Sequence, residues 1–241
     1  MERRSGVALW RQIADDLRTD IATGNLAKAG CLPPELELAA NFGVNRHTVR
    51  AAITALSNEG IVESRQGQGT FIKRQSRLVY PISRRTRFAA GLANQAKMTS
   101  ATLLDEVLEC ATQEVANALE LTSGAAVLRL DVLSTADGLP VSRSTNYFAA
   151  ARFSGIARAF AETGSFTQSL NRLGIADYVR QSTLVEARHA TMEDASDLKL
   201  SPGAIVLITK GINADLDGQR IQYAVTRFPA DRVSLTLDNR P

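Results

Sequence analysis

The spacing of apolar residues near the N-terminus is that of an amphipathic helix. Within residues 7–23, apolar side chains recur at every fourth position, at Leu9, Ile13, Leu17 and Ile21. Positions four apart lie on one face of an α-helix, so this face is expected to be buried. Glycine is favoured just after the end of a helix, and the helix is therefore expected to stop at Gly24.

A second apolar pattern predicts two short helices joined by a tight turn. Gly43 is expected to end the first helix, and Asn45 to cap the second by accepting a hydrogen bond from a backbone N–H group two or three residues later. Val49, Ile53 and Leu56 form one apolar face of the second helix. Leu38, Phe42 and Val44 are expected to pack on this face and complete a small core. This is the spacing of a helix-turn-helix.

Beyond Gly60, the pattern changes from helical to extended. Residues 61–65 and 70–73 read as two short strands, and Gln66-Gly67-Gln68-Gly69 lies between them as the tip of a hairpin. A hairpin that follows a helix-turn-helix in this way is a wing.

From residue 88 onward, strands and helices are mixed. Two hairpins are predicted around Asp137-Gly138 and Asp217-Gly218, because an Asp-Gly pair between apolar runs is a strong turn signal. The flanking strands are expected at 125–133, 139–148, 205–212 and 220–228, and amphipathic helices near 153–161, 166–173 and 192–200. Residues 102–108 are apolar without clean alternation. The second part of the chain is therefore expected to be α+β, with an antiparallel sheet and helices on one of its faces.

Charge composition also changes between the N-terminal third of the chain and the remainder. With 241 residues, of which 44% are hydrophobic and 22% charged, two packed domains are expected. Residues 1–77 hold 11 basic and 8 acidic residues, residues 78–87 add three arginines, and residues 88–241 hold 14 basic and 17 acidic residues. A polyanionic partner such as DNA therefore fits the N-terminal third.

Several classes of protein are disfavoured. Cys31 and Cys110 are too few for a disulfide framework, and the absence of a signal-peptide pattern or long apolar run predicts a cytoplasmic protein without membrane attachment. His47 and His189 lie far apart without ligand spacing, so neither a metal site nor a cofactor is predicted. No nucleophile elbow or phosphate loop occurs, and no catalytic residue is assigned.

The chemistry of the second short helix suits DNA. Arg46, His47 and Arg50 are expected on its exposed side, where arginine can give two parallel hydrogen bonds to guanine, and His47 and Thr48 can reach phosphates or single base edges. Taken singly, the two arginines also fit a solvated helix face, and Gly67-x-Gly69 also fits an ordinary turn. The order of helix, turn, arginine-bearing helix and glycine-tipped hairpin favours DNA binding.

These motifs resemble the heads of GntR-family transcription regulators. The resemblance covers about the first 75 residues and rests on Leu32-Pro33-Pro34-Glu35, Val44 to Arg50, Gly60 and Gln66 to Phe71. The run Asn45-Arg46-His47-Thr48 resembles the PhnF type within the HutC subfamily, the repressors of phosphonate-utilisation operons. The resemblance implies that the DNA-binding residues are Pro34, Glu35, Asn45, Arg46, His47, Thr48, Arg50, Gln66, Gly67, Gln68 and Gly69. Leu36 stands where many family members have arginine, so the preferred operator is expected to differ.

The remainder resembles the UTRA effector domain, whose fold is like that of chorismate lyase. The resemblance rests on residues 137–141, Tyr147-Phe148, Gly164-Ser165, Gln222-Tyr223 and 227–232. It implies a small-molecule pocket between sheet and helices, and a homodimer formed mainly by these domains. The predicted organisation is a winged helix-turn-helix over residues 1–75, a linker over 76–87 and a UTRA domain over 88–241.

The resemblance also assigns effector-binding residues. They are Arg87, Phe88, Ser165, Arg180, Gln222 and Tyr223. Val132 and Ser134 stand where relatives that sense sugar phosphates have arginines, Thr167 stands where tyrosine is common, and Gln222 replaces a frequent glutamate. For Arg129, Arg180 and Arg227, ordinary ion pairs are an alternative to anion binding, and Tyr147 and Tyr223 also fit core positions with a hydrogen-bonded hydroxyl.

The functional hypothesis is a dimeric, ligand-responsive repressor of phosphonate uptake or degradation genes. Its partners are double-stranded operator DNA, with an inverted repeat, and a small anionic effector such as a phosphonate or a phosphate-bearing compound. The alternative is a HutC-like regulator that answers to an amino sugar, urocanate or another carboxylate. A lyase-like enzyme is the remaining alternative.

Overall fold

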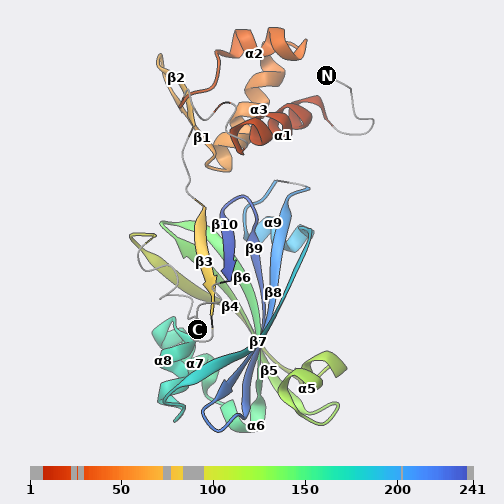
Figure 1. Cartoon of the computed structure of the whole chain (residues 1–241), viewed down its shortest axis with the longest axis vertical. Coiled ribbons are helices and arrows are strands. Elements are labelled where there is room, and N and C mark those ends of the chain that lie inside the picture. The colour runs from red at the N-terminus through yellow and green to blue at the C-terminus, as the bar shows by residue number, and fades with distance from the viewer. Residues whose placement is uncertain are drawn as a thin grey trace. The chain divides into compact units, whose positions relative to one another are not determined.

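The computed structural model shows two compact units, residues 1–76 and 77–241 (Figure 1). The structure describes residues 8–22, 26, 30–72, 77–83, 95–201 and 203–237. Each unit has its own hydrophobic core.

The N-terminal unit begins with three helices around one core. They are α1 (Leu9–Ala22), α2 (Glu35–Phe42) and α3 (Arg46–Asn58). Ile13 and Leu17 of α1 and Val49 and Leu56 of α3 are almost fully buried against one another. The predicted apolar faces of these helices are confirmed.

The turn between α2 and α3 forms as its residue types predict. Gly43 ends α2 with the positive φ of 65°, a backbone conformation that costs glycine little. The side chain of Asn45 accepts a hydrogen bond from the backbone N–H of Thr48 at 2.8 Å and so caps α3. This cap sets where α3 begins and therefore which residues occupy its first turn.

The predicted wing is a short hairpin. Strands β1 (Val62–Arg65) and β2 (Gly69–Ile72) pair antiparallel, with Arg65 opposite Gly69. Residues 66–68 form the connecting turn, in which the backbone N–H of Gln68 donates to the carbonyl oxygen of Arg65 at 3.0 Å. The hairpin is attached to the helices because Val62 is buried in their core.

A six-stranded antiparallel sheet forms the centre of the C-terminal unit. Its strand order is β4-β5-β6-β9-β8-β7. The strands are β4 (Thr99–Cys110), β5 (Ala126–Ala136), β6 (Leu139–Ala149), β7 (Tyr178–His189), β8 (Ile205–Asp215) and β9 (Arg220–Pro229). Together with its helices, this sheet confirms the predicted α+β class.

Both predicted hairpins are present, but their turns differ. Asp137 and Gly138 alone connect β5 to β6, with φ angles of 49° and 80°, the left-handed pair that a two-residue hairpin turn requires. The second turn is longer, since residues 216–219 separate β8 from β9 and Asp215 closes it by accepting from the N–H of Gln219 at 2.9 Å.

Helices cover both faces of the sheet, which corrects the prediction of one covered face. On the first face lie α6 (Ala150–Phe153), α7 (Ile156–Thr163) and α8 (Phe166–Arg172), packed on Leu128, Leu130 and Phe148. On the second lie α5 (Gln113–Leu119) and α9 (Met192–Asp197), packed on neighbouring residues such as Val127 and Val225. Successive side chains of a strand point to opposite faces, and these central strands carry apolar side chains on both. Both faces are therefore covered by helices.

Strand β3 (Leu78–Ile82) lies within the range predicted as a linker. It pairs in parallel with β10 (Val233–Leu237), and Tyr80 of this pair packs against Phe228 of the sheet with ring centroids 5.0 Å apart. The range 76–87 is therefore not wholly a linker, because part of it belongs to the C-terminal unit. The apolar run at residues 78–80 is the sequence signal for this strand, but it lies between the arginines on which the linker prediction rested.

Candidate functional sites

The first turns of α3 hold two arginines that share one carboxylate. Glu35, the first residue of α2, accepts from Arg46 Nε at 2.6 Å through Oε2. The same carboxylate accepts from Arg50 Nε at 3.1 Å and from a terminal nitrogen of Arg50 at 2.9 Å. Both arginine side chains remain at least half exposed, so their guanidinium groups sit at the surface in a defined orientation.

The charge of Glu35 is held by these contacts. Hydrogen bonds from Arg50 and Arg46 lower the pKa of Glu35 to about 2, because they stabilise the ionised carboxylate more than its slight burial disfavours it. Glu35 is therefore an anion throughout the physiological range. The sequence resemblance made Glu35 a DNA contact, which stays a prediction; in the structure its carboxylate binds two other residues of that set.

The remaining predicted residues of this surface are exposed or partly exposed. His47 and Pro34 are exposed, and the Thr48 hydroxyl lies 2.9 Å from the capping oxygen of Asn45. At the wing, residues 66–69 are all exposed, and Gly67 and Gly69 have φ angles of 72° and 106°. Glycine adopts such angles without strain, and most other residues do so only at a cost, so this turn favours glycine at both positions.

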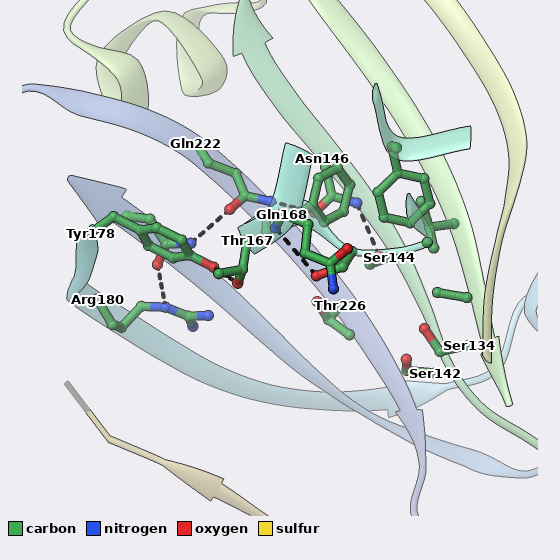
Figure 2. A pocket seen from close by; sticks show the side chains of 18 of the residues that line it. Ser134, Ser142, Ser144, Asn146, Thr167, Gln168, Tyr178, Arg180, Gln222 and Thr226 are labelled. Atoms are coloured by element: carbon green, nitrogen blue, oxygen red, sulfur yellow. Dashed lines mark hydrogen bonds between the residues drawn. The ribbon is translucent and has the colours of Figure 1, made fainter. Parts of the chain in front are cut away.

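The second candidate site is a pocket of about 280 Å³ on the first face of the sheet (Figure 2). Its floor comes from β5, β6, β8 and β9, and its walls from the start of α8, from β7 and from Tyr80 of β3. Apolar side chains such as Ala101, Val132, Phe160 and Phe166 form part of the lining, and Arg180 contributes a cation. The lining also holds a set of hydroxyl and amide side chains: Ser134, Ser142, Ser144, Asn146, Ser165, Thr167, Gln168, Asn213, Gln222 and Thr226.

Hydrogen bonds link Arg180 to the floor of the pocket. Arg180 Nε donates to Asn213 Oδ1 at 2.7 Å, and Asn213 Nδ2 donates to Gln222 Oε1 at 2.7 Å. Gln222 Nε2 donates to Asn146 Oδ1 at 2.9 Å, and Asn146 Nδ2 donates to Ser144 Oγ at 3.0 Å. Figure 2 shows this series crossing the pocket from Arg180 to Ser144.

The predicted effector residues fall into three groups. Ser165, Arg180 and Gln222 line the pocket. Tyr223 does not, which corrects its assignment: it lies in the core under α5, on the second face, where its hydroxyl donates to Glu114 at 2.6 Å. Adjacent strand residues point to opposite faces, so Gln222 and Tyr223 cannot share a site on one face. Arg87 and Phe88 lie outside the described residues.

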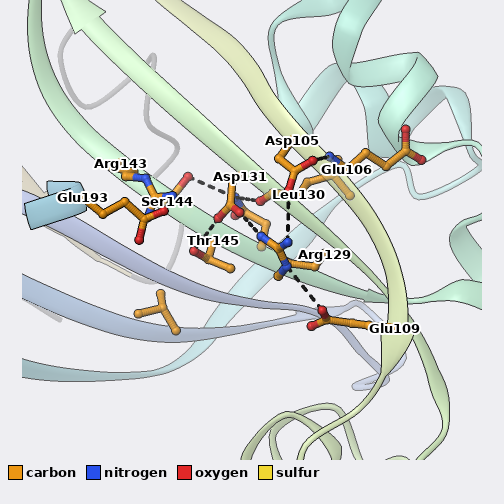
Figure 3. Close-up of polar contacts among 12 residues, drawn as sticks. Asp105, Glu106, Glu109, Arg129, Leu130, Asp131, Arg143, Ser144, Thr145 and Glu193 are labelled. Atoms are coloured by element: carbon orange, nitrogen blue, oxygen red, sulfur yellow. Dashed lines mark hydrogen bonds and ion pairs between the residues drawn. The ribbon is translucent and has the colours of Figure 1, made fainter. Parts of the chain in front are cut away.

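Two other candidate arginines are held in ion pairs on the second face. Figure 3 shows Arg129 bound to Asp105, Glu109 and Asp131. Arg227 donates to the Thr145 hydroxyl at 3.0 Å and lies 3.5 Å from Asp194. The alternative of ordinary ion pairs therefore describes both residues, whereas Arg180 has amide and hydroxyl partners.

Sequence reasoning missed most of the pocket floor. Ser142, Ser144 and Asn146 occupy every second position of β6, and all three line the pocket. Polar residues at alternate positions of a strand that is buried on both faces are costly unless they have partners. This alternation is present in the sequence and marks the side of the strand that faces the pocket.

Comparison with known proteins identifies both units. The model for "Bacterial regulatory proteins, gntR family" matches residues 9–72, and the model for the UTRA domain matches residues 94–234.

The chain belongs to the GntR family.

Full-length relatives agree with this assignment. An uncharacterized HTH-type transcriptional regulator of Rhizobium meliloti (strain 1021) is 49% identical, over 99% of this chain and 98% of its own length. The probable transcriptional regulator PhnF of Escherichia coli (strain K12) is 31% identical, over 86% of both chains. The crystal structure of PhnF from Mycobacterium smegmatis has the same fold, with a TM-score of 0.63 at 24% identity over 87% of this chain and 91% of that chain.

As a GntR-family chain with a UTRA domain, the protein is a transcription regulator of the PhnF-like type. Membership of this family implies DNA binding and a small-molecule effector. Among its described residues, no helix is long and apolar enough to cross a membrane. The same part of the chain contains no group of three His, Cys, Asp or Glu residues that could hold a metal ion.

Replacing Glu35 by glutamine is expected to relax sequence selectivity in the GntR head. The change removes a negative charge beside the first turns of α3, so affinity for non-operator DNA should rise a few-fold, while Arg46 and Arg50 keep only a neutral amide oxygen as their common acceptor. The ratio of operator to non-operator affinity should fall. Competition titrations with both DNAs measure this ratio, and an unchanged ratio would show that Glu35 does not orient the arginines.

Replacing Gly67 by valine is expected to weaken operator binding several-fold without unfolding the head. A Cβ at Gly67 meets no atom within 4 Å, so the strain comes from its positive φ, which a β-branched residue tolerates poorly. Gly67→Asn is the matched control, because asparagine tolerates such angles. Operator titration and thermal melting test this prediction, and unchanged affinity of the valine variant would remove the wing from the mechanism.

Proposed function

We propose that this regulator is a repressor that binds an inverted-repeat operator as a homodimer and is released by a small anionic effector. The observation that supports DNA reading is the pair of oriented guanidinium groups in the first turns of a capped helix. Two such helices, one from each copy, would enter successive major grooves about one helical turn apart. We propose that the DNA-binding residues inferred from the sequence form the contacts with the operator.

For the effector, we propose a phosphonate or phosphate-bearing compound. The chain is 31% identical to a protein named PhnF, and its pocket contains the guanidinium of Arg180 among hydroxyl and amide groups. Among the described residues that line this pocket, none carries a carboxylate. An anion fits such a lining because hydrogen bonds to charged groups are stronger than those between neutral groups.

Release requires that the effector bind more tightly to the DNA-incompetent state than to the competent one. A tenfold loss of operator affinity corresponds to about 1.4 kcal/mol of coupling between the two sites. A few additional hydrogen bonds to the effector in one state would be enough to supply this difference.

The decisive experiment is a titration of the purified protein onto its own upstream DNA at two salt concentrations. Each titration is repeated with phosphonates, inorganic phosphate, sugar phosphates, an amino sugar and urocanate. Selective, salt-sensitive binding released by a phosphonate supports the proposal, and release by the amino sugar or urocanate supports the HutC-like alternative. Binding without sequence selectivity contradicts the proposed operator function.

A further inference from the structure

The hydrogen-bond series from Arg180 to Ser144 has a fixed direction because of its two ends. A guanidinium group can only donate hydrogen bonds, so the atom of Asn213 that faces Arg180 Nε must be its oxygen. A backbone carbonyl can only accept, so the atom of Asn146 that lies 3.3 Å from the carbonyl oxygen of Leu130 must be its nitrogen. Neither end can be reversed without loss of a hydrogen bond.

Gln222 joins these two ends. It accepts from Asn213 at 2.7 Å and donates to Asn146 at 2.9 Å, which is the arrangement that continues the direction set at both ends. The residues Asn146, Asn213 and Gln222 are each at most 4% exposed. An amide that is this little exposed is costly to leave without a hydrogen-bond partner.

The direction of the series decides what the pocket offers to a ligand. Ser144 Oγ accepts from Asn146, so the proton of the Ser144 hydroxyl is left to donate elsewhere, and Ser144 lines the pocket. At the other end, Arg180 contributes a cation. Both ends of the series therefore present hydrogen-bond donors, and the described lining has no carboxylate to balance them.

The backbone of β8 makes room for Arg180. A Cβ built at Gly211 would collide with the Arg180 guanidinium group, so this arginine lies over a strand position that has no side chain. From there it reaches Asn213 with Nε and the Thr183 hydroxyl with a terminal nitrogen at 3.3 Å. Gly211 thus leaves room for the cation, and the hydrogen bonds to Asn213 and Thr183 hold it at the pocket.

We propose that Gln222 is a specificity-determining residue: by fixing the direction of this series, it makes the pocket bind an oxyanion whose other polar groups are hydroxyls and reject the equivalent ligand with an ammonium group. This inference rests on the proposed function, because it concerns the effector pocket of the same regulator. It goes further by naming a chemical feature that the effector lacks.

Glutamate at position 222 would reverse one half of the series. A carboxylate accepts from both neighbours, so Asn146 would have to turn its nitrogen toward Glu and its oxygen toward Ser144, and it would lose its hydrogen bond to the carbonyl oxygen of Leu130. Ser144 would then donate to Asn146 and offer only lone pairs to the ligand. The same change adds a negative charge, and both effects favour an ammonium group.

The test uses two pairs of probes that differ only by a hydroxyl or an ammonium group. They are 2-hydroxyethylphosphonate with 2-aminoethylphosphonate, and glucose 6-phosphate with glucosamine 6-phosphate. Isothermal titration calorimetry of the full-length wild-type protein at pH 7.5 gives the affinity ratio within each pair. We expect at least one pair to bind with a tenfold or greater preference for the hydroxyl member, and Gln222→Glu to reduce or invert that preference by at least tenfold.

A second variant and a control separate the direction of the series from charge alone. Asn213→Asp reverses the series from its other end, and Arg180 keeps the new carboxylate ionised, so the preference should again fall. Gln168→Glu makes the same chemical change in the pocket lining as Gln222→Glu, but the Gln168 side chain is not part of the series. Gln168 is exposed, so the effect of this variant on the ratio measures the contribution of a negative charge at the exposed part of the lining, and it should be several-fold smaller.

Three outcomes would overturn this inference: equal or tighter wild-type binding of the ammonium members, binding of none of the four probes, or an equal effect of Gln168→Glu and Gln222→Glu. Operator binding is measured on the same preparations. A protein that binds its operator selectively but shows no preference within the pairs refutes the inference and leaves the repressor proposal standing. A protein that shows the preference but binds no operator refutes the proposed function instead.

Discussion

Replacing Arg50 by alanine is expected to lower operator affinity on the order of 5- to 100-fold and to relax specificity at one base pair. This is the loss that accompanies removal of a two-pronged arginine–guanine contact. Arg50 is suited to that contact because Glu35 already holds its guanidinium group at the surface through two hydrogen bonds. Titration against a set of operators with single base changes measures both effects.

Arg50→Lys is the matched variant for this prediction. Lysine keeps the charge but lacks the planar fork, so it should restore affinity for DNA in general and not the preference for guanine. If Arg50→Ala instead weakens binding to all sequences equally and lowers the salt dependence by about one phosphate contact, Arg50 binds the DNA backbone.

Replacing Asp194 by alanine is expected to reduce the free energy of unfolding by about 3 kcal/mol, because it removes a buried carboxylate that pairs with two partly buried arginines. Asp194 is 1% exposed, accepts from Arg188 at 2.6 Å and from the backbone N–H of Thr191 at 3.0 Å, and faces Arg227. It also closes the capping box of α9. Urea unfolding of both proteins, followed by circular dichroism, gives the difference.

The control is Glu162→Ala, which removes an exposed carboxylate that also pairs with two arginines, Arg158 and Arg172. Exposed pairs contribute little, so this variant should unfold nearly as the wild type does. An equal loss in the two variants would contradict the role of burial.

The contribution of Asp194 should also depend on pH. Burial disfavours its charge, but hydrogen bonds from Thr191 and Arg188 outweigh this and lower its pKa. A lowered native pKa stabilises the fold above the pKa of an unfolded aspartate, about 3.9, and this stabilisation is lost as the pH falls further. The difference between wild type and Asp194→Ala should therefore shrink in acid.

The helices of the GntR head could be predicted from the sequence because their signals are local. A glycine that ends α2, an asparagine that caps α3 and apolar residues four apart each act within a few positions. The contact of Glu35 with Arg46 and Arg50 could not be predicted in this way. It joins residues 11 and 15 positions apart, and only the angle between two helices brings them together.

The UTRA domain was harder to predict because its elements depend on distant partners. Strand β7 lies at the edge of the sheet, is mostly exposed on both sides and therefore lacks the alternation that marks a strand. The pocket was located in part, through Ser165, Arg180 and Gln222. Tyr223 was misplaced because a shift of one residue along a strand exchanges the two faces of a sheet.

The pairing of β3 with β10 sets the limits of any chimeric regulator built from this protein. The match to the UTRA family covers residues 94–234. Strand β3 (Leu78–Ile82) lies before this range, yet it pairs with β10 (Val233–Leu237). A graft cut at the family boundaries would leave out β3 and end within β10, and it would uncover Phe228, on which Tyr80 packs. A cassette for sensor swapping should therefore include residues 77–237.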